Sequence, residues 1–226
     1  MNSEVLKTDA SSARIRYFWV VLFAVAFGFV EASVVVYLRA LYYPEGFALP
    51  LKLMTTPHAL TELVREFATL VMLVAVGWIA GKAPWERFAY FMIAFAVWDI
   101  FYYVWLKVLL NWPAGLLDWD VLFLIPVPWV GPVIAPVLIS LAMLLSGTTI
   151  IALFAQGKGF HPPAVSWLLA VASVGFLLYS FAGDTAAMLH GKFPAPYRYD
   201  FLLIGLFCAG AALARALARR PPGSSP

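Results

Sequence analysis

The sequence predicts an all-α fold: a polytopic membrane bundle of about six transmembrane helices. The first observation is composition, because 63% of the 226 residues are hydrophobic, 12% are charged and the mean hydropathy is +0.87. Soluble domains are roughly 45–50% apolar and about 25% charged. The second is that six apolar runs could each cross a hydrocarbon core of about 30 Å, which takes roughly 20 helical residues. These runs use up the chain, so we expect no separate soluble catalytic domain.

The predicted helices follow one another with short connections. They are Tyr17–Tyr43, Leu60–Ala80, Arg87–Leu110, Gly131–Ala155, Val165–Leu189 and Phe201–Leu217. The first run is longer than the apolar core of a signal peptide, so we expect a retained helix and not a cleaved leader. We therefore expect a polar cytoplasmic segment at 1–16, one transmembrane domain at 17–218 and a disordered tail at 219–226, which includes the letters PPGSSP.

The fourth segment is unusual because DWDVLFLIPVPWVGPVIAP carries prolines at positions 126, 128, 132 and 136. Proline removes a backbone donor and kinks a helix. Irregular backbone at membrane depth survives only where protein or a cavity surrounds it. We therefore expect a proline-broken or re-entrant entry to the fourth helix, whose acids and tryptophans close the outer mouth of a cavity. These residues are Asp118, Trp119, Asp120 and Trp129. An interfacial loop with an aromatic belt is an equally good interpretation.

Positive charge predicts the orientation, because cytoplasmic loops retain Lys and Arg. With the N-terminus inside, nine of the fifteen Lys and Arg residues fall on the inner side: Lys7, Arg14, Arg16, Lys82, Arg87, Lys158, Arg215, Arg219 and Arg220. We therefore expect a protein of the plasma (inner) membrane with both termini cytoplasmic. The net charge of +3 and the pI near 9.0 come largely from these residues, so we expect no nucleic-acid partner.

Motifs of soluble enzymes are missing from the chain. Cys208 is the single cysteine, so it can neither form an internal disulfide nor begin a thiolate metal cluster. The sequence contains no Walker loop, dinucleotide fingerprint or nucleophile elbow. We therefore expect no cofactor and no bound metal ion.

Three carboxylates lie inside otherwise apolar runs. With a helix rise of about 1.5 Å per residue, Glu31 and Asp99 fall near the bilayer centre, and Glu66 falls about two turns below the outer end of its helix. A carboxylate at the centre costs roughly 2.5–3.5 kcal/mol on insertion scales, so such residues face a bundle interior or a watery cavity and usually have a role. Their shared depth predicts one cavity, with Glu31, Glu66 and Asp99 as candidate catalytic residues.

Polar and aromatic side chains on the same helix faces are candidate ligand-binding residues, because residues three and four apart share a face. They are Glu62, Trp98, Tyr102, Tyr103, Trp129 and Asp184. Acids outnumber bases in this region, so we expect the deepest acids to be unpaired and either protonated or facing a cation. The alternative is a set of purely structural ion pairs, with Arg39, Arg65 and Lys107 as the bases.

The segments FVEASVVVYLRALYY, REFATLVM and WDIFYYVWLK, followed by a proline-rich segment that carries tryptophan, resemble the EXPERA family over roughly residues 17–145. That family includes the emopamil-binding sterol isomerase and the sigma-2 receptor. The resemblance implies a pocket that opens within the bilayer and holds the cationic amine of a drug or the carbocation formed from a sterol. It implies Glu31, Glu66 and Asp99 as pocket acids and Trp129 as an aromatic wall. The chain departs from the family in having two further helices and no histidine beside Glu31.

Four functions remain open, and we favour the first. It is an enzyme or binder for a lipid-like molecule, either a sterol or isoprenoid or an amphipathic cation. One protonated acid would act as a general acid beside an ionised partner, as in an isomerase-type lipid enzyme. The rings of Trp98, Tyr102 and Tyr103 would stabilise positive charge. The expected partner is then a membrane lipid or a lipid-like small molecule, and a homo-oligomer is left open.

The second function is a proton- or cation-coupled small-molecule transporter, because intramembrane carboxylates also form proton relays. The third is a metal site, suggested by His58, Glu62 and Glu66 at four-residue steps on one helix. The fourth is a structural subunit of a larger membrane complex.

Overall fold

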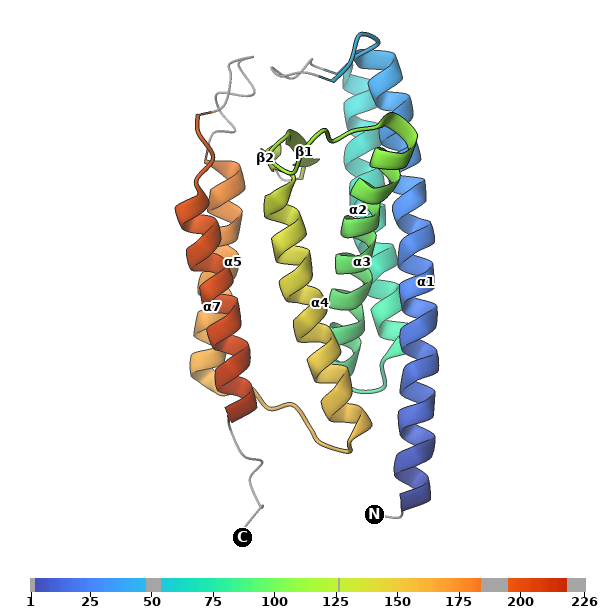
Figure 1. Ribbon diagram of the computed structural model, residues 1–226, viewed down its shortest axis with the longest axis vertical. Helices are drawn as coiled ribbons and strands as arrows, with labels where there is room; N and C mark the ends of the chain where they lie inside the picture. Colours follow the sequence, from blue (N-terminus) through green and yellow to red (C-terminus); the bar gives the residue numbers. More distant parts are fainter. Residues whose placement is uncertain (1–2, 48–53, 126, 184–194, 219–226) are drawn as a thin grey trace.

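The computed structural model describes residues 3–47, 54–125, 127–183 and 195–218. In these residues six helices run side by side (Figure 1). They are α1 (Ser3–Tyr42), α2 (Thr56–Ala80), α3 (Pro84–Leu110), α4 (Ile134–Ala155), α5 (Ala164–Ala182) and α7 (Tyr199–Ala218). Each contains a segment long and apolar enough to cross a membrane. The predicted class is confirmed: the chain is an integral membrane protein with an all-α bundle fold.

Helix α3 is the centre of the bundle, because its buried residues extend from Glu86 to Leu106 and it packs against α1, α2 and α4. Small residues allow this close packing. A Cβ on Gly28 of α1 would lie 2.9 Å from the carbonyl oxygen of Trp98, and one on Gly147 of α4 would lie 2.8 Å from that of Ala89. Both distances are too short for a side chain, so glycine is needed where these helices meet α3.

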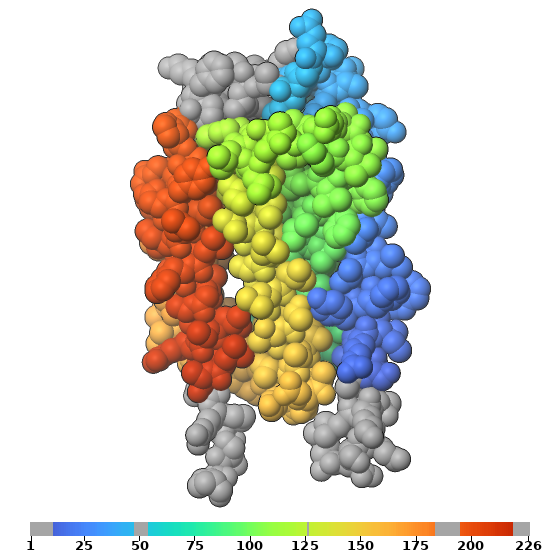
Figure 2. Space-filling view, in the orientation of Figure 1, coloured from blue at the N-terminus to red at the C-terminus, as the bar shows by residue number. Residues whose placement is uncertain are grey.

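Helices α5 and α7 form a pair at one side of the bundle. They pack closely against each other, and the Ser173 hydroxyl donates a hydrogen bond of 2.7 Å to the Gly205 carbonyl oxygen. Their packing against α4 is much looser, and the space-filling view shows a gap between the surfaces of α4 and α7 (Figure 2). The α5–α7 pair is therefore an appendage to the α1–α4 unit.

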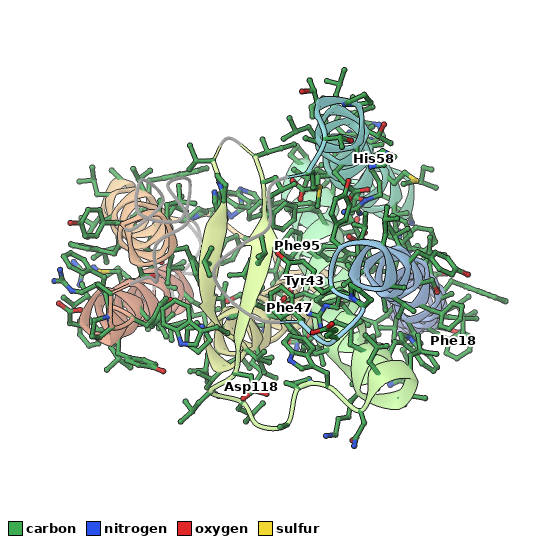
Figure 3. All side chains as sticks on the ribbon, turned by 90° about the horizontal axis from the view of Figure 1, so that it is seen from above. Phe18, Tyr43, Phe47, His58, Phe95 and Asp118 are labelled. Atoms are coloured by element: carbon green, nitrogen blue, oxygen red, sulfur yellow. The ribbon has the colours of Figure 1, made fainter. Side chains whose placement is uncertain are left out.

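A small antiparallel hairpin precedes α4. Its strands are β1 (Trp119–Phe123) and β2 (Trp129–Pro132), with Trp119 opposite Pro132 and Val121 opposite Val130. Seen from above, the hairpin lies between the α5–α7 pair and the α1–α3 unit (Figure 3). We call this end of the bundle the hairpin end. The opposite end, where α1 begins and α7 ends in Figure 1, is called the termini end.

The prolines of the fourth segment act before the helix and not within it. Pro128 and Pro132 lie in or beside the hairpin, while Pro136 lies in the first turn of α4, where a missing N–H interrupts no helical hydrogen bond. Helix α4 is continuous from Ile134, so the expected break is an entry hairpin followed by an intact helix. Pro126 lies outside the described residues.

Other boundaries differ modestly from the expected ones. Helix α1 already begins at Ser3, so the described part of the predicted polar segment at 1–16 is helical and continuous with the apolar run, and its cytoplasmic position stays a prediction. Helix α5 ends at Ala182, and residues 184–194 and the predicted tail at 219–226 lie outside the described residues. The start of α1 and the end of α7 lie at the same end of the bundle, as an even number of described crossings requires (Figure 1). Which side of a membrane this end faces stays a prediction.

At the termini end a partly buried ion pair joins α1 to the start of α3. Arg16 Nη2 donates to Glu86 Oε1 at 2.8 Å, and Arg16 Nη1 donates to the Ala80 carbonyl oxygen at 3.1 Å. The other Glu86 oxygen accepts the backbone N–H groups of Lys82 (2.7 Å) and Ala83 (3.4 Å). Glu86 therefore both caps the N-terminus of α3 and anchors α1.

Candidate functional site

A partly open cavity of about 400 Å³ lies at the hairpin end of the α1–α3 unit. Its lining comes from α1 and the segment after it, α2, α3 and β1, and Tyr43 and Phe47 lie near the middle of the view from above (Figure 3). Helices α1 and α2 each pack on α3 but scarcely on each other, which leaves this space between them. Sites for small organic ligands span about 300–1,000 Å³, so the cavity is large enough for one.

Seven of the nine candidate site residues line this cavity: Glu31, Glu62, Glu66, Trp98, Asp99, Tyr102 and Tyr103. Trp129 is not part of the lining. Its ring packs against Phe123 and, in parallel, against Phe181 of α5, with centroids 5.8 and 6.3 Å apart. The side chain leaves the hairpin toward α5, so its expected role as an aromatic wall of a ligand site stays a prediction. Asp184 lies outside the described residues.

Arg65 of α2 holds two of the cavity acids. Its Nη1 contacts Glu31 of α1, and its Nε donates to Glu62 Oε2 at 2.7 Å. The Thr69 hydroxyl donates to the second Glu31 oxygen at 3.4 Å. Glu31 is thus paired, and the expectation of unpaired deep acids is wrong at this position. The reason is that Arg65 is nine residues from the start of α2 and Glu31 is eleven residues from the end of α1, so both lie at similar depth.

Glu66 has a different partner, although it follows Arg65 directly in the sequence. Its two carboxylate oxygens share the backbone N–H of Leu124, at 3.0 and 2.9 Å. No ion pair to Glu66 is present within the described ranges. Glu66 therefore ties α2 to the end of β1 through a neutral donor and has no cationic partner among the described residues.

Asp99 of α3 also has only a neutral donor. The Ser140 hydroxyl of α4 donates to Asp99 Oδ2 at 2.8 Å, and no ion pair to Asp99 occurs in the part of the chain that the structure describes. The suggested structural pair with Lys107 does not form. Lys107 instead donates to the carbonyl oxygens of Asn111 (3.3 Å) and Pro113 (2.9 Å), near the end of α3.

The hairpin brings a fifth acid, Asp120, to the cavity. Arg39 Nη2 donates to Asp120 Oδ1 at 3.0 Å, and the Tyr102 hydroxyl donates to Oδ2 at 3.2 Å. The Arg39 guanidinium also lies over the rings of Trp112 (3.8 Å) and Phe47 (4.4 Å). Burial raises the pKa of the Asp120 carboxyl above its usual value of 3.8, and the opposing attraction of Arg39 is the smaller effect. This pair joins the hairpin to α1.

Sequence reasoning missed several groups that complete the site. Arg39 and Arg65 were considered only as alternative structural partners, yet both line the cavity and determine which acids are neutralised. Thr69 and Ser140 are polar residues inside apolar spans, and that signal was available in the sequence. The backbone N–H of Leu124 had no sequence signal, because only the hairpin exposes it.

The structure does not assemble the suggested metal site. The Tyr42 hydroxyl of α1 contacts Nδ1 of His58, and His58 is not among the lining residues of the cavity. Figure 3 shows His58 on the outer part of α2. Within the described residues, no three His, Cys, Asp or Glu side chains are arranged to hold a metal ion.

No protein-family model, curated protein or solved structure matches the chain. The fold and the site therefore define its class: an integral membrane protein of six described transmembrane helices with a cavity at the hairpin end. The lining of that cavity contains five acids and two arginines among mostly apolar side chains.

Proposed function

We propose that the protein binds a lipid-like molecule in this cavity, and that a cationic or hydroxylated amphipathic ligand is preferred over an anion. The observation that carries the proposal is the surplus of acids. Arg39 and Arg65 are already paired with Asp120, Glu31 and Glu62, whereas Glu66 and Asp99 accept hydrogen bonds from neutral donors only. A buried carboxylate without a cationic partner is costly, so a cationic or hydrogen-bonding occupant is stabilised there.

The apolar part of the lining supports a lipid-like ligand. Between the charged groups the walls are formed by aliphatic side chains, among them Val35, Leu38 and Leu63. The helices that carry them are long and apolar enough to lie within a bilayer. An amphipathic molecule would place its head group near Glu66 and Asp99 and its apolar part along these walls.

The acids also fit isomerase-type chemistry, which is the enzymatic form of this proposal. One protonated carboxyl would donate a proton to one carbon of a carbon–carbon double bond, which leaves a cation on the other carbon. A neighbouring carboxylate would then remove a proton from the next carbon beyond that cation. The double bond moves and the proton count is unchanged. The rings of Trp98, Tyr102 and Tyr103 would stabilise the intermediate cation. The implied EXPERA-like pocket remains part of this proposal, as do the cytoplasmic position of both termini and a membrane lipid as the partner.

Asp99→Asn tests the proposal. The substitution keeps the shape of the side chain and its contact with Ser140 but removes the charge. Thermal unfolding of the detergent-solubilised protein would be measured with lipophilic amines and with fatty acids of equal chain length, since a ligand that binds only the folded state raises the apparent stability. We expect amines to stabilise the wild type and to bind the variant about 10–100-fold more weakly, because a hydrogen bond to a charged group contributes about 1.5–3 kcal/mol.

Asp200→Asn is the matched control for this experiment. Asp200 is an exposed acid at the start of α7, paired with Arg198 and absent from the cavity lining, so this variant should respond to amines like the wild type. Equal stabilisation by amines and fatty acids, or a normal amine response in Asp99→Asn, would contradict the proposal. A pH-gradient-driven flux in reconstituted vesicles that Asp99→Asn abolishes would instead support a transporter.

A further inference from the structure

We propose that the ligand of this cavity carries a hydrogen-bond-accepting oxygen beside its donor group, so that its head group is an alcohol or an amino alcohol and not a plain alkylammonium. The inference rests on the proposed function and narrows its ligand class. It comes from donors in the lining that lack an acceptor of their own, an observation separate from the surplus of acids.

The first such donor is the indole N–H of Trp98. This side chain lines the cavity and is only 4% exposed, and its Nε1 has no hydrogen-bond partner among the described residues. Its neighbours explain why. The ring packs against Phe27, Phe95 and Phe123, with centroids 6.4, 5.4 and 6.2 Å away, and these rings offer no oxygen acceptor. A buried tryptophan usually finds a partner for this group, so we assign the acceptor to the occupant of the cavity.

The second donor is the Tyr103 hydroxyl, about one and a half turns further along α3. It also lines the cavity, is 6% exposed and makes no hydrogen bond of good geometry in the described part of the chain. The Asp120 carboxyl lies within hydrogen-bonding reach of this hydroxyl. That carboxyl also accepts from Arg39 and Tyr102, so Tyr103 shares its acceptor with two other donors. The α3 wall thus presents one buried donor without a partner, Trp98, and one whose acceptor is shared, Tyr103.

These donors and the surplus acids make opposite demands on a ligand. Glu66 and Asp99 offer acceptor oxygens, and when ionised a carboxylate only accepts. Trp98 only donates. An ammonium group can satisfy the acids but cannot accept from Trp98, because it has no acceptor. A hydroxyl can donate to a carboxylate and accept from an N–H at the same time. A head group with a hydroxyl, alone or beside an amine, therefore matches this lining better than an amine alone.

A set of three ligands with equal alkyl chains tests the inference on the full-length protein in detergent: a primary alkylamine, the corresponding vicinal amino alcohol and the alkyltrimethylammonium ion. Dissociation constants would be measured by calorimetry on the wild type and on Trp98→Phe, which retains an apolar aromatic ring and removes the N–H. We expect the wild type to bind the amino alcohol about 10-fold more tightly than the amine, the scale of one hydrogen bond. In Trp98→Phe the two constants should become about equal.

Trp167→Phe is the matched control. This tryptophan is 53% exposed on α5 and is absent from the cavity lining, so the preference should survive its substitution. Tyr103→Phe provides a second test, because it removes only a hydroxyl and should reduce the preference by a smaller factor.

A spectroscopic readout keeps the inference testable even if Trp98→Phe folds poorly. In protein labelled with nitrogen-15 at its tryptophans, the Trp98 indole resonance should move downfield when the amino alcohol binds and move little when the amine binds. Equal affinity for the two ligands, or an unmoved resonance with bound amino alcohol, would overturn this inference and leave the proposed function standing. Failure of all three ligands to bind would overturn the proposed function and this inference with it.

Discussion

Buried charges lie at both ends of the α1–α3 unit, but the two groups of charges differ in composition. At the termini end, one acid and one base pair with each other, and the second oxygen of Glu86 accepts two backbone N–H groups at the start of α3. At the hairpin end, five acids and two arginines line a cavity. Three of those acids are paired with arginine, and Glu66 and Asp99 are not.

The difference separates charges that hold the helices together from charges that remain available to a ligand. Burying an ion is costly, and a partner must offset that cost. Arg16 and Glu86 meet this requirement within the protein, so their contribution is to stability. Glu66 and Asp99 have no cationic partner among the described residues, so the acids that exceed the bases are concentrated in the cavity. The comparison of the two ends also predicts which substitutions should change the stability most.

The largest loss of stability is expected for Arg39→Leu, which leaves Asp120 buried without its cation. The side chains of this pair are 10% and 3% exposed, and breaking a buried pair costs about 3–5 kcal/mol. Thermal unfolding in detergent would measure the loss. The double variant Arg39→Leu with Asp120→Leu should recover much of it, since no unpaired charge remains. A loss of stability below about 1 kcal/mol in Arg39→Leu would contradict this prediction, because it is the size expected for a solvent-exposed ion pair.

A smaller loss is expected for Glu86→Gln at the termini end. The amide oxygen can still accept a hydrogen bond, and Arg16 is 25% exposed and so partly solvated. We expect a loss of about 1–2 kcal/mol, within the range for hydrogen bonds to charged groups. The amine response should be unchanged, because Glu86 is remote from the cavity lining. The control is Asp200→Asn, which removes an exposed pair and should leave the unfolding temperature unchanged. A lost amine response in Glu86→Gln would break the distinction between the two ends.

The smallest expected effect is the pH dependence from Asp120. Its pKa in the folded protein is raised above 3.8 by burial. As pH rises from below that value, the unfolded chain therefore loses the proton first, and the folded state becomes less stable until its own pKa is passed. Unfolding temperatures measured between about pH 4 and about pH 7 should fall less steeply with pH in Asp120→Asn than in the wild type. Glu45→Gln, at an exposed acid after α1, should keep the wild-type slope. An identical slope in Asp120→Asn would contradict the raised pKa.

Much of the candidate site could be predicted because depth follows from position along a helix. Glu31, Glu66 and Asp99 were placed at similar depths from the helix rise alone, and the structure brings all three to one cavity. Glu62, Trp98, Tyr102 and Tyr103 followed from helical spacing. Their roles in binding or catalysis stay predictions. Trp129 is not among the lining residues, because it lies on a strand whose side-chain direction depends on the partner strand, and no helical spacing applies there.

The sequence by itself determined the membrane class, the six apolar helices and the depth of the buried acids, because hydropathy and helix rise depend only on residues near one another in the chain. Tertiary structure alone decided which acids are neutralised. Arg39 and Asp120 are 81 residues apart, and Arg65 and Glu31 are 34 apart. Their pairing depends on how each helix is rotated against its neighbours and on where the β1–β2 hairpin lies. Packing around α3 sets those rotations, so it also leaves Glu66 and Asp99 without a cation.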